Sequence, residues 1–301
     1  MTAPSRRTHA RPDTDAPPDT HVRSDTRARP GLDQDLDFAI DLAEEAGRLL
    51  TDRYERVERI DYKSARDVVT EVDHLSEELI LGAIRRSRPG DGILAEETGE
   101  HLGLEPGATI VPPTLAEGVG RTWVVDPIDG TINYANGIPF FCVSIGLVVD
   151  GVPAAGVIHD PMRRETFAAS LDGPATLDGR PIVASDKERA SDFVVSMALS
   201  GKAVATRARA VRRAVRVSRS MGSAALALAY VANGRFDAFV QQGGLSAWDI
   251  AAAGLIAERA GAIVTDMAGG RWFDLARAPK TIGLLAAPAA HHAALLGLTA
   301  G

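Results

Sequence analysis

The feature that most constrains the fold is a run of apolar segments between Phe140 and Ala169, separated by tight-turn residues. The pair Asp150-Gly151 divides two of these segments, and Asp-Gly between apolar runs is a strong signal for a β-hairpin. Further Asp-Gly pairs follow at Asp172-Gly173 and Asp178-Gly179. Successive hairpins place neighbouring strands side by side, so this part of the chain is expected to form an antiparallel sheet.

After Ala184 the pattern changes to short apolar segments that alternate with alanine-rich stretches of helical length. The helical stretches are expected at 203–215, 222–233 and 249–260. Such alternation is typical of α/β structure. We therefore expect an α+β domain over 32–184, followed by an α/β domain over 185–301.

The ends of the first half differ in composition from its centre. Residues 1–31 contain no Leu, Ile or aromatic residue, so burial cannot offset the entropy of ordering them, and we predict a disordered tail. Apolar residues at helical spacing predict helices from about Leu32 and over 74–88. Residues 100–120 carry Pro, Gly and Glu without a period and predict a surface excursion.

The overall composition limits the classes of partner and the compartment. A net charge of −7 argues against a protein that coats nucleic acid, and no stretch reaches the ~20 apolar residues of a membrane span. The pair Arg6-Arg7 lacks the apolar region that an export signal requires. The single cysteine, Cys142, lies in an apolar run, so a buried thiol in a reducing cytoplasm is expected.

The first candidate for chemistry is the segment Asp126-Pro127-Ile128-Asp129-Gly130-Thr131, which follows an apolar strand. Two carboxylates three residues apart across a tight turn can point to one spot, where their repulsion asks for a cation or for protonation. Hard oxygen ligands favour Mg²⁺ or related ions. The segment alone is equally consistent with an acidic surface turn.

Three more acidic clusters stand elsewhere in the sequence. Glu96-Glu97 ends the apolar strand 93–95, and ligands are commonly placed at strand ends. Asp249 follows Trp248 directly before a predicted helix, where aspartate is also a preferred N-cap. The charged segment that begins at Lys63 ends in Asp73, which by itself predicts a second helix N-cap. Each cluster in isolation is consistent with a purely structural role.

In this order and with these spacings, the four clusters resemble the inositol monophosphatase family. That family belongs to a larger group of lithium-sensitive, metal-dependent phosphatases that includes fructose-1,6-bisphosphatases and bisphosphate nucleotidases. The resemblance covers roughly residues 36–298, and its most specific segments are 123–144 and 248–266. It implies an α+β and α/β architecture layered as an αβαβα sandwich of the inositol monophosphatase and sugar phosphatase type, commonly in a homodimer.

The resemblance also implies a role for each site residue. It implies that two or three Mg²⁺ ions are held by Glu96, Asp126, the carbonyl of Ile128, Asp129 and Asp249. It implies that the attacking water is oriented and helped to lose its proton by the catalytic group Asp73, Thr131 and Glu97. It implies that the substrate is held by Gly130, Thr131, Gly222, Ser223, Ala224, Gln242 and Asp249.

The implied activity is a Mg²⁺-dependent hydrolysis of inositol 1-phosphate or a similar polyol or sugar monophosphate. Gln242 stands where inositol-specific relatives often have a glutamate, and an uncharged amide leaves the choice of polyol open. The alternatives within the same chemistry are a histidinol-phosphate phosphatase, a fructose-1,6-bisphosphatase or a bisphosphate nucleotidase. A non-catalytic regulatory protein is less favoured, because every expected ligand is present.

Overall fold

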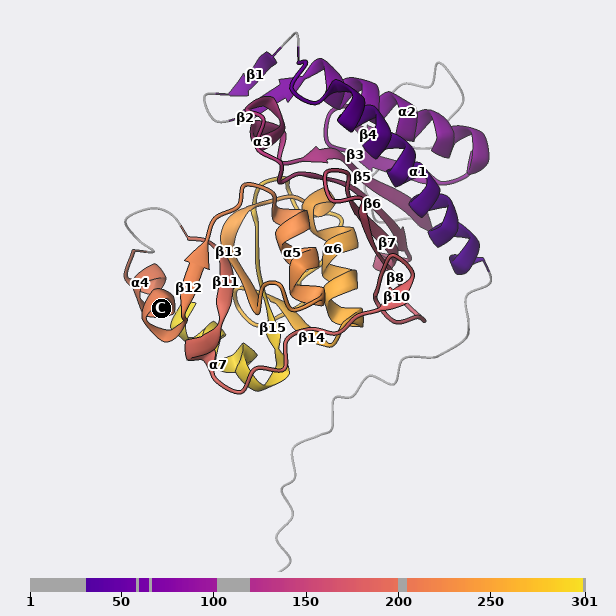
Figure 1. The fold of residues 1–301 in the computed structure, drawn as a ribbon. Helices are drawn as coiled ribbons and strands as arrows, with labels where there is room; N and C mark the ends of the chain where they lie inside the picture. Colours follow the sequence, from indigo (N-terminus) through magenta and orange to yellow (C-terminus); the bar gives the residue numbers. More distant parts are fainter. Residues whose placement is uncertain (1–30, 58–59, 65–66, 102–119, 200–204, 300–301) are drawn as a thin grey trace, which may run out of the picture.

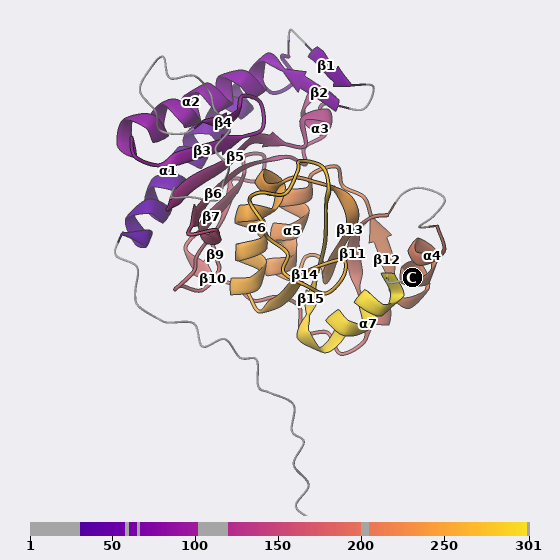
Figure 2. The same ribbon diagram turned by 180° about the vertical axis from the view of Figure 1, so that it is seen from behind.

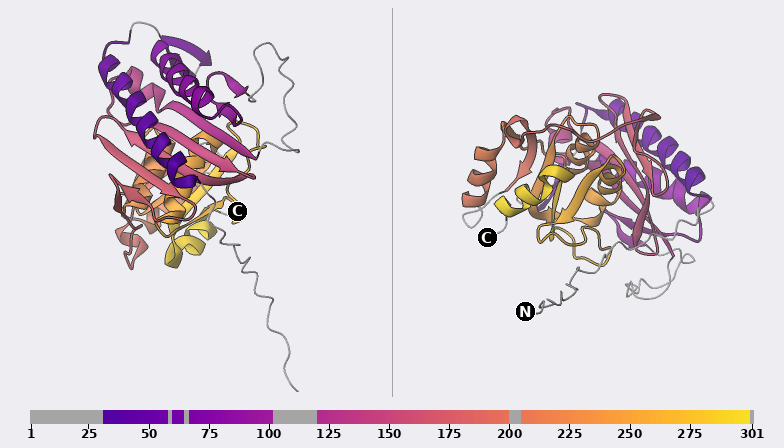
Figure 3. Two further views of the ribbon diagram at one scale, coloured as in Figure 1. Left: turned by 90° about the vertical axis from the view of Figure 1, so that its right-hand side faces the viewer. Right: turned by 90° about the horizontal axis from the view of Figure 1, so that it is seen from below.

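The computed structural model describes residues 31–57, 60–64, 67–101, 120–199 and 205–299. The predicted tail and most of the excursion at 100–120 lie outside these residues. Within them the chain forms five layers, in which helices and sheets alternate (Figures 1 and 3). The predicted αβαβα sandwich is thus confirmed.

The outermost layer on one side consists of α1 (Leu32–Arg53) and α2 (Glu71–Ser87), which lie across the first sheet (Figure 2). One face of α1 is apolar at helical spacing, and its buried side chains include Ala39, Ala43 and Leu50. The two helices pack on each other as well as on the sheet, since α1 contacts β7 and α2 contacts β5. In the sequence, the short antiparallel pair β1 (Ile60–Ser64) and β2 (Asp67–Thr70) connects these two helices.

The first sheet has eight strands in the order β10-β9-β8-β7-β6-β5-β3-β4. The strands are β3 (Gly92–Ala95), β4 (Gly99–His101), β5 (Arg121–Asp129), β6 (Cys142–Val149), β7 (Val152–Asp160), β8 (Glu165–Ser170), β9 (Thr176–Leu177) and β10 (Arg180–Pro181). The predicted hairpins pair antiparallel, with Val149 opposite Val152 across the turn at Asp150. The pair β3 and β5 is parallel, so both strands end at the same edge.

The second sheet has five strands in the order β12-β11-β13-β15-β14. The strands are β11 (Val194–Ala198), β12 (Val217–Arg219), β13 (Ala238–Leu245), β14 (Ala262–Asp266) and β15 (Ile282–Pro288). Its outer side carries α4 (Ala205–Ala214) and α7 (Ala289–Thr299), which contact each other. The remaining short elements are α3 (Thr131–Ala135) and the 3₁₀ turn η1 (Ala190–Asp192).

The central layer consists of α5 (Ala224–Ala232) and α6 (Ala247–Arg259), which lie between the two sheets (Figure 1). Both helices are apolar on nearly every side, as expected of helices that are buried all round. The sheet approaches α6 closely, since a Cβ added at Gly156 would lie 2.7 Å from Cα of Ala252. Small residues on both surfaces therefore bring the start of α6 close to the edge of the first sheet.

The predicted boundary at 184 falls between β10 and β11. Buried side chains from both halves form one cluster around α5 and α6, so the division into two domains stays a prediction. The homodimer likewise stays a prediction. Among the described helices, none is both long enough and apolar enough to cross a membrane.

Candidate active site

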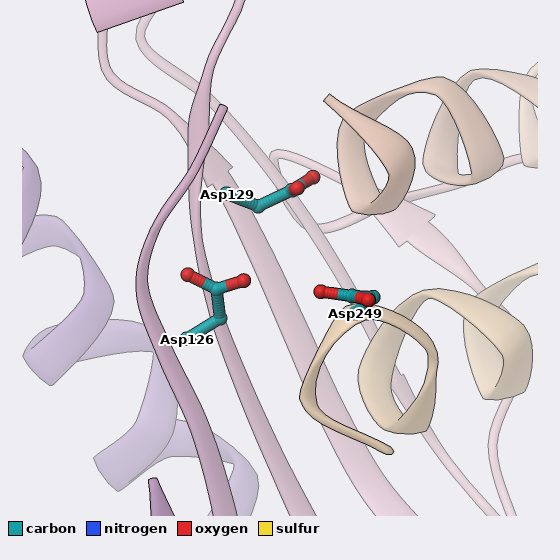
Figure 4. A group of neighbouring side chains, drawn as sticks. All are labelled: Asp126, Asp129 and Asp249. Atoms are coloured by element: carbon teal, nitrogen blue, oxygen red, sulfur yellow. The ribbon is translucent and has the colours of Figure 1, made fainter. Parts of the chain in front are cut away.

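Three elements bring acidic residues together where the parallel strands β3 and β5 end. The N–H of Glu96 donates to the carbonyl of Val125 at 3.2 Å, so Glu96 and Asp126 lie side by side where the pairing of β3 with β5 ends. The start of α6 brings Asp249 from the second half of the chain. Figure 4 shows Asp126, Asp129 and Asp249 pointing toward one another, and one carboxylate oxygen of each lies within 4.8 Å of the others.

The electrostatics of this acidic cluster favour a bound cation. Burial raises the pKa of Asp126 well above its ordinary value, and the nearby carboxylates of Glu96 and Asp129 raise it further. The pKa of Asp249 is also raised well above its ordinary value, first by burial and then by Asp129. Carboxylates that resist ionisation for these reasons become ionised when a cation supplies positive charge.

Hydrogen bonds fix the orientation of each carboxylate. Oδ2 of Asp129 accepts from the hydroxyl of Ser223 at 2.6 Å and from the N–H of Ala225 at 2.5 Å, at the start of α5. Oδ2 of Asp249 accepts from the N–H of Ser246 at 2.6 Å. These bonds hold the two carboxylates in place at the starts of α5 and α6.

Asp73 and Thr131, two of the predicted catalytic residues, are in direct contact. The hydroxyl of Thr131 lies 2.9 Å from Oδ1 of Asp73 and 3.0 Å from the carbonyl of Ile128. Oδ2 of Asp73 accepts from both the N–H and the hydroxyl of Thr70, at 2.8 and 2.6 Å. Burial raises the pKa of Asp73, and the bonds from Thr70 and Thr131 oppose that rise.

The turn that joins the ligands to Thr131 requires glycine at position 130. Gly130 has φ = 104°, in the region that favours glycine. A Cβ there would lie 3.1 Å from the carbonyl oxygen of Phe140 and 3.2 Å from Cβ of Ser223. The backbone therefore passes close to the start of α5, which keeps the N–H groups of Gly130 and Thr131 at the acidic cluster.

A cavity of about 300 Å³ opens at the acidic cluster. Its lining includes Glu96, Asp129 and Asp249 on one side and segments of the second sheet on the other. The predicted substrate contacts that line it are Gly222, Ser223 and Ala224. Gln241 lines it, whereas Gln242 does not belong to the lining, and among the described residues Oε1 of Gln242 has no hydrogen-bond partner. A substrate contact by Gln242 thus stays a prediction.

Two predictions about helix starts are wrong. Asp73 and Asp249 are not N-caps, because α2 begins after Thr70 and α6 begins after Ser246. Each aspartate is the third residue of its helix, and its carboxylate accepts from the N–H of the N-cap residue. In the capping box a hydroxyl residue takes the cap and an acidic residue three positions later bonds back to the N–H of the cap residue. The spacing Thr/Ser-x-x-Asp resembles this pattern and was the missed signal.

Two side chains near the site were missed by sequence reasoning. Lys280 lines the cavity, its N–H donates to Oγ of Ser246 at 3.0 Å, and its φ is 60°. Glu77 lies on α2, is 1% exposed, and accepts from the N–H of Glu97 at 2.8 Å. Glu97 itself is half-buried at the end of β3, where the sequence predicted it. No local sequence signal marks Lys280, because it reaches Ser246 only through the folding of the second sheet.

The donor set fits a hard divalent cation. Asp126, Asp129 and Asp249 offer carboxylate oxygens only, with the carbonyl of Ile128 and the carboxylate of Glu96 close by. Such oxygen ligands are typical of Mg²⁺, Mn²⁺ and Ca²⁺. Together with an oriented threonine hydroxyl and a polar cavity, the arrangement is suited to hydrolysis of a small anionic ester.

Comparison with known proteins identifies the family from most of the chain. Residues 32–300 match the inositol monophosphatase family. The chain is 35% identical over 239 residues to the fructose-1,6-bisphosphatase/inositol-1-monophosphatase of Thermotoga maritima, covering 78% of this chain and 85% of that protein. It is 34% identical over 243 residues to the Nus factor SuhB of Salmonella typhimurium, covering 78% and 86%.

A solved structure agrees with these sequence relationships. The inositol monophosphatase of Anabaena (Nostoc) superposes with a TM-score of 0.72 at 32% sequence identity, covering 89% of this chain and 96% of that one. The matched region spans both sheets and every residue of the acidic cluster. The chain therefore belongs to the inositol monophosphatase family, a family of metal-dependent phosphatases that act on small phosphorylated substrates, and is itself a phosphatase.

Proposed function

We propose that the protein is a Mg²⁺-dependent phosphomonoesterase that hydrolyses inositol 1-phosphate or a similar polyol or sugar monophosphate. The observation that carries the proposal is the convergence of Asp126, Asp129 and Asp249 within 4.8 Å at the mouth of a polar cavity. With Glu96 and the carbonyl of Ile128, these residues would hold two or three Mg²⁺ ions. Bound Mg²⁺ would supply a more acidic water and would offset charge on the phosphate.

The chain's own groups orient the reacting partners. Oγ1 of Thr131 accepts a hydrogen bond from the attacking water and passes its own proton toward Asp73, which lies 2.9 Å away. The N–H groups of Gly130 and Thr131, at the start of α3, donate to the phosphate oxygens. Glu97 positions a further water. Phosphoryl transfer needs mainly such positioning and charge stabilisation, so no nucleophilic side chain is required.

The cavity supports a small substrate. Its volume of about 300 Å³ is at the lower end for small-molecule sites, which favours a single sugar or cyclitol ring over a nucleotide. Hydroxyl groups of the ring meet Gly222, Ser223 and Ala224, and we keep Gln242 and Asp249 as predicted contacts. We further propose a homodimer in the cytoplasm, which light scattering and cell fractionation would check.

A second candidate is a sugar bisphosphatase, and Lys280 favours it. This lysine lines the same cavity, and its ammonium group would attract a second phosphate. The relative from Thermotoga maritima carries both activities in its name. The same positive charge disfavours histidinol phosphate, which carries an ammonium group of its own.

A substrate panel tests the proposal. Phosphate release is measured from inositol 1-phosphate, fructose 1,6-bisphosphate, histidinol phosphate and an adenosine bisphosphate, with Mg²⁺, with EDTA and with added lithium. We expect release that needs Mg²⁺, that millimolar lithium inhibits, and that is fastest for inositol 1-phosphate or a related polyol. Equal kcat/KM values for all four compounds would exclude a selective polyol phosphatase.

A further inference from the structure

The side of α2 that faces the sheet carries three buried polar side chains. Asp73, Ser76 and Glu77 are 1%, 0% and 1% exposed. Their spacing of three and four residues places them on one face of the helix, where apolar side chains would normally pack. Burying a carboxylate without compensation is costly, so these groups should have specific partners.

Each of the three side chains contacts a different residue beside the predicted metal ligands. Asp73 holds the hydroxyl of Thr131 at 2.9 Å. Ser76 donates from Oγ to the carbonyl of Pro127 at 3.3 Å, in the irregular end of β5 between Asp126 and Asp129. Oε2 of Glu77 accepts from the N–H of Glu97 at 2.8 Å. One helix face thus contacts both segments through which the first half supplies predicted ligands, 126–131 and 96–97.

The contact of Glu77 fixes the backbone around Glu96. The N–H of Glu96 donates to Val125, in the strand that carries Asp126, at 3.2 Å. The next N–H, that of Glu97, donates to Glu77. The backbone around Glu96 is therefore held from both sides, by β5 and by α2, and the side chain of Glu96 lines the cavity.

A purely structural role does not account for Glu77. Its second oxygen, Oε1, is buried, and within the described part of the chain it has no hydrogen-bond partner. The side chain also places a further carboxyl group close to the acidic residues Glu96, Asp126, Asp129 and Asp249. An apolar residue of similar size would fill the space at lower cost, unless the acceptor is needed for the position of Glu96.

We propose that Glu77 is a positioning residue for the metal site, which sets the place of Glu96 through the N–H of Glu97. The inference rests on the proposed function, because it requires a cation bound at the acidic cluster. Partners that orient metal ligands without touching the metal typically contribute 10–100-fold to its affinity. We therefore expect the contact to act on metal affinity more than on stability.

Mn²⁺ binding to the purified full chain, measured by calorimetry, tests the inference without substrate. Glu77→Met removes the acceptor and keeps most of the volume, so we expect Mn²⁺ to bind about 10–100-fold more weakly. Glu77→Gln retains an acceptor oxygen and should recover most of that loss. Glu78→Met makes the same change at the neighbouring, exposed position and should leave the affinity unchanged.

A double variant shows whether Glu77 acts through Glu96. In the Glu96→Ala background, Glu77→Met should cause little further loss, because the residue that it positions is gone. Equal losses in both backgrounds would overturn the inference, as would a Glu77→Met protein with unchanged Mn²⁺ affinity. So would equal weakening by Gln and Met, since that would assign the effect to charge rather than to the hydrogen bond.

Hydrogen exchange keeps the inference testable if Glu77→Met does not fold. In the wild-type protein without metal, the amide of Glu97 should exchange more slowly than an unprotected amide. Exchange of Glu97 at the unprotected rate would contradict the inference. If the wild-type protein binds no Mn²⁺, or if Asp126→Asn leaves its Mn²⁺ binding unchanged, the proposed function itself is wrong. If the wild-type protein binds Mn²⁺ and Glu77→Met does not weaken that binding, only this inference is wrong.

Discussion

The two walls of the cavity are built differently. On the acidic side, where Asp129 lines the cavity, the side chains of Asp73, Asp126 and Asp129 are buried, and each accepts at least one hydrogen bond from the backbone. On the opposite wall, Lys280 and Gly244 are exposed. The side-chain amide of Gln241 donates locally, to the carbonyl of Gly243.

This difference separates chemistry from selectivity. The positions of the carboxylates are over-determined, as expected where catalysis depends on preorganised charge. The opposite wall includes Gly244, Gln241 and Lys280, none of them a predicted metal ligand, so it can accommodate different alcohols without disturbing the ligands. Changes on the first wall should therefore alter the rate and the metal dependence, whereas changes on the second should alter the choice of substrate.

The largest effect is expected from Asp129→Asn. The change removes a metal ligand but little volume, so the fold should persist while phosphate release falls at least ~1,000-fold, because metal stabilisation of the transition state amounts to several kcal/mol. Circular dichroism and kcat at saturating Mg²⁺ measure both parts. Near wild-type turnover in the folded variant would show that the acidic wall is not where the chemistry occurs.

The next largest effect is expected from Thr131→Val, which is nearly isosteric and removes the hydroxyl that faces Asp73. Positioned proton transfer typically contributes 10²–10⁴-fold, so kcat should fall by about that factor with little change in KM. Thr131→Ser keeps the hydroxyl and serves as the matched control. If Val and Ser variants have the same kcat, the hydroxyl has no part in the reaction.

A smaller effect, on stability, is expected from Asp126→Asn in the absence of metal. Folding raises the pKa of Asp126 above its ordinary value of 3.8, so the folded state binds more protons than the unfolded state between the two values. Stability is therefore lost as the pH rises through that interval.

The amide variant avoids this cost. In EDTA at neutral pH, its free energy of unfolding should exceed that of the wild type by about 1 kcal/mol, which corresponds to a melting temperature about 2–4 °C higher. In excess Mg²⁺ the wild type should instead melt at the higher temperature. Scanning calorimetry at pH 5 and pH 7 measures both effects, and the advantage of the variant should shrink at the lower pH. A variant that melts lower than the wild type in EDTA would contradict the account of this wall.

The smallest effect is expected on the opposite wall, from Lys280→Met. Exposed charges typically contribute up to ~1 kcal/mol, so kcat/KM for fructose 1,6-bisphosphate should fall by about fivefold or less relative to inositol 1-phosphate. Arg85→Met changes an exposed charge on α2, away from the cavity lining, and is the matched control. A Lys280→Met protein whose kcat falls equally for both substrates would break the separation between the walls.

The two walls also differed in how far the sequence predicted them. The segment from Asp126 to Thr131, together with Glu96 and Asp249, was found because a strand followed by a tight acidic turn is a local pattern. Lys280 and Gln241 were not, because their place depends on the pairing of β13 with β15, which connects distant parts of the chain.

The same difference between local pattern and long-range packing is seen within the helix α2. Asp73 was identified through the resemblance, but Glu77, four residues later, reads as part of an ordinary polar face. Only the packing of α2 on the sheet shows that this face is buried. Local spacing thus predicted which residues could bind a cation, and tertiary packing was needed to identify the residues that hold them in place.

The most direct test of the central claim is phosphate release from inositol 1-phosphate by the wild-type protein as Mg²⁺ is increased from zero. We predict no release in EDTA, a saturable increase with Mg²⁺, and no increase at any Mg²⁺ concentration for Asp249→Asn in the same assay. Release that persists in EDTA, or that Asp249→Asn supports as well as the wild type, would contradict a metal-dependent phosphatase centred on the acidic cluster.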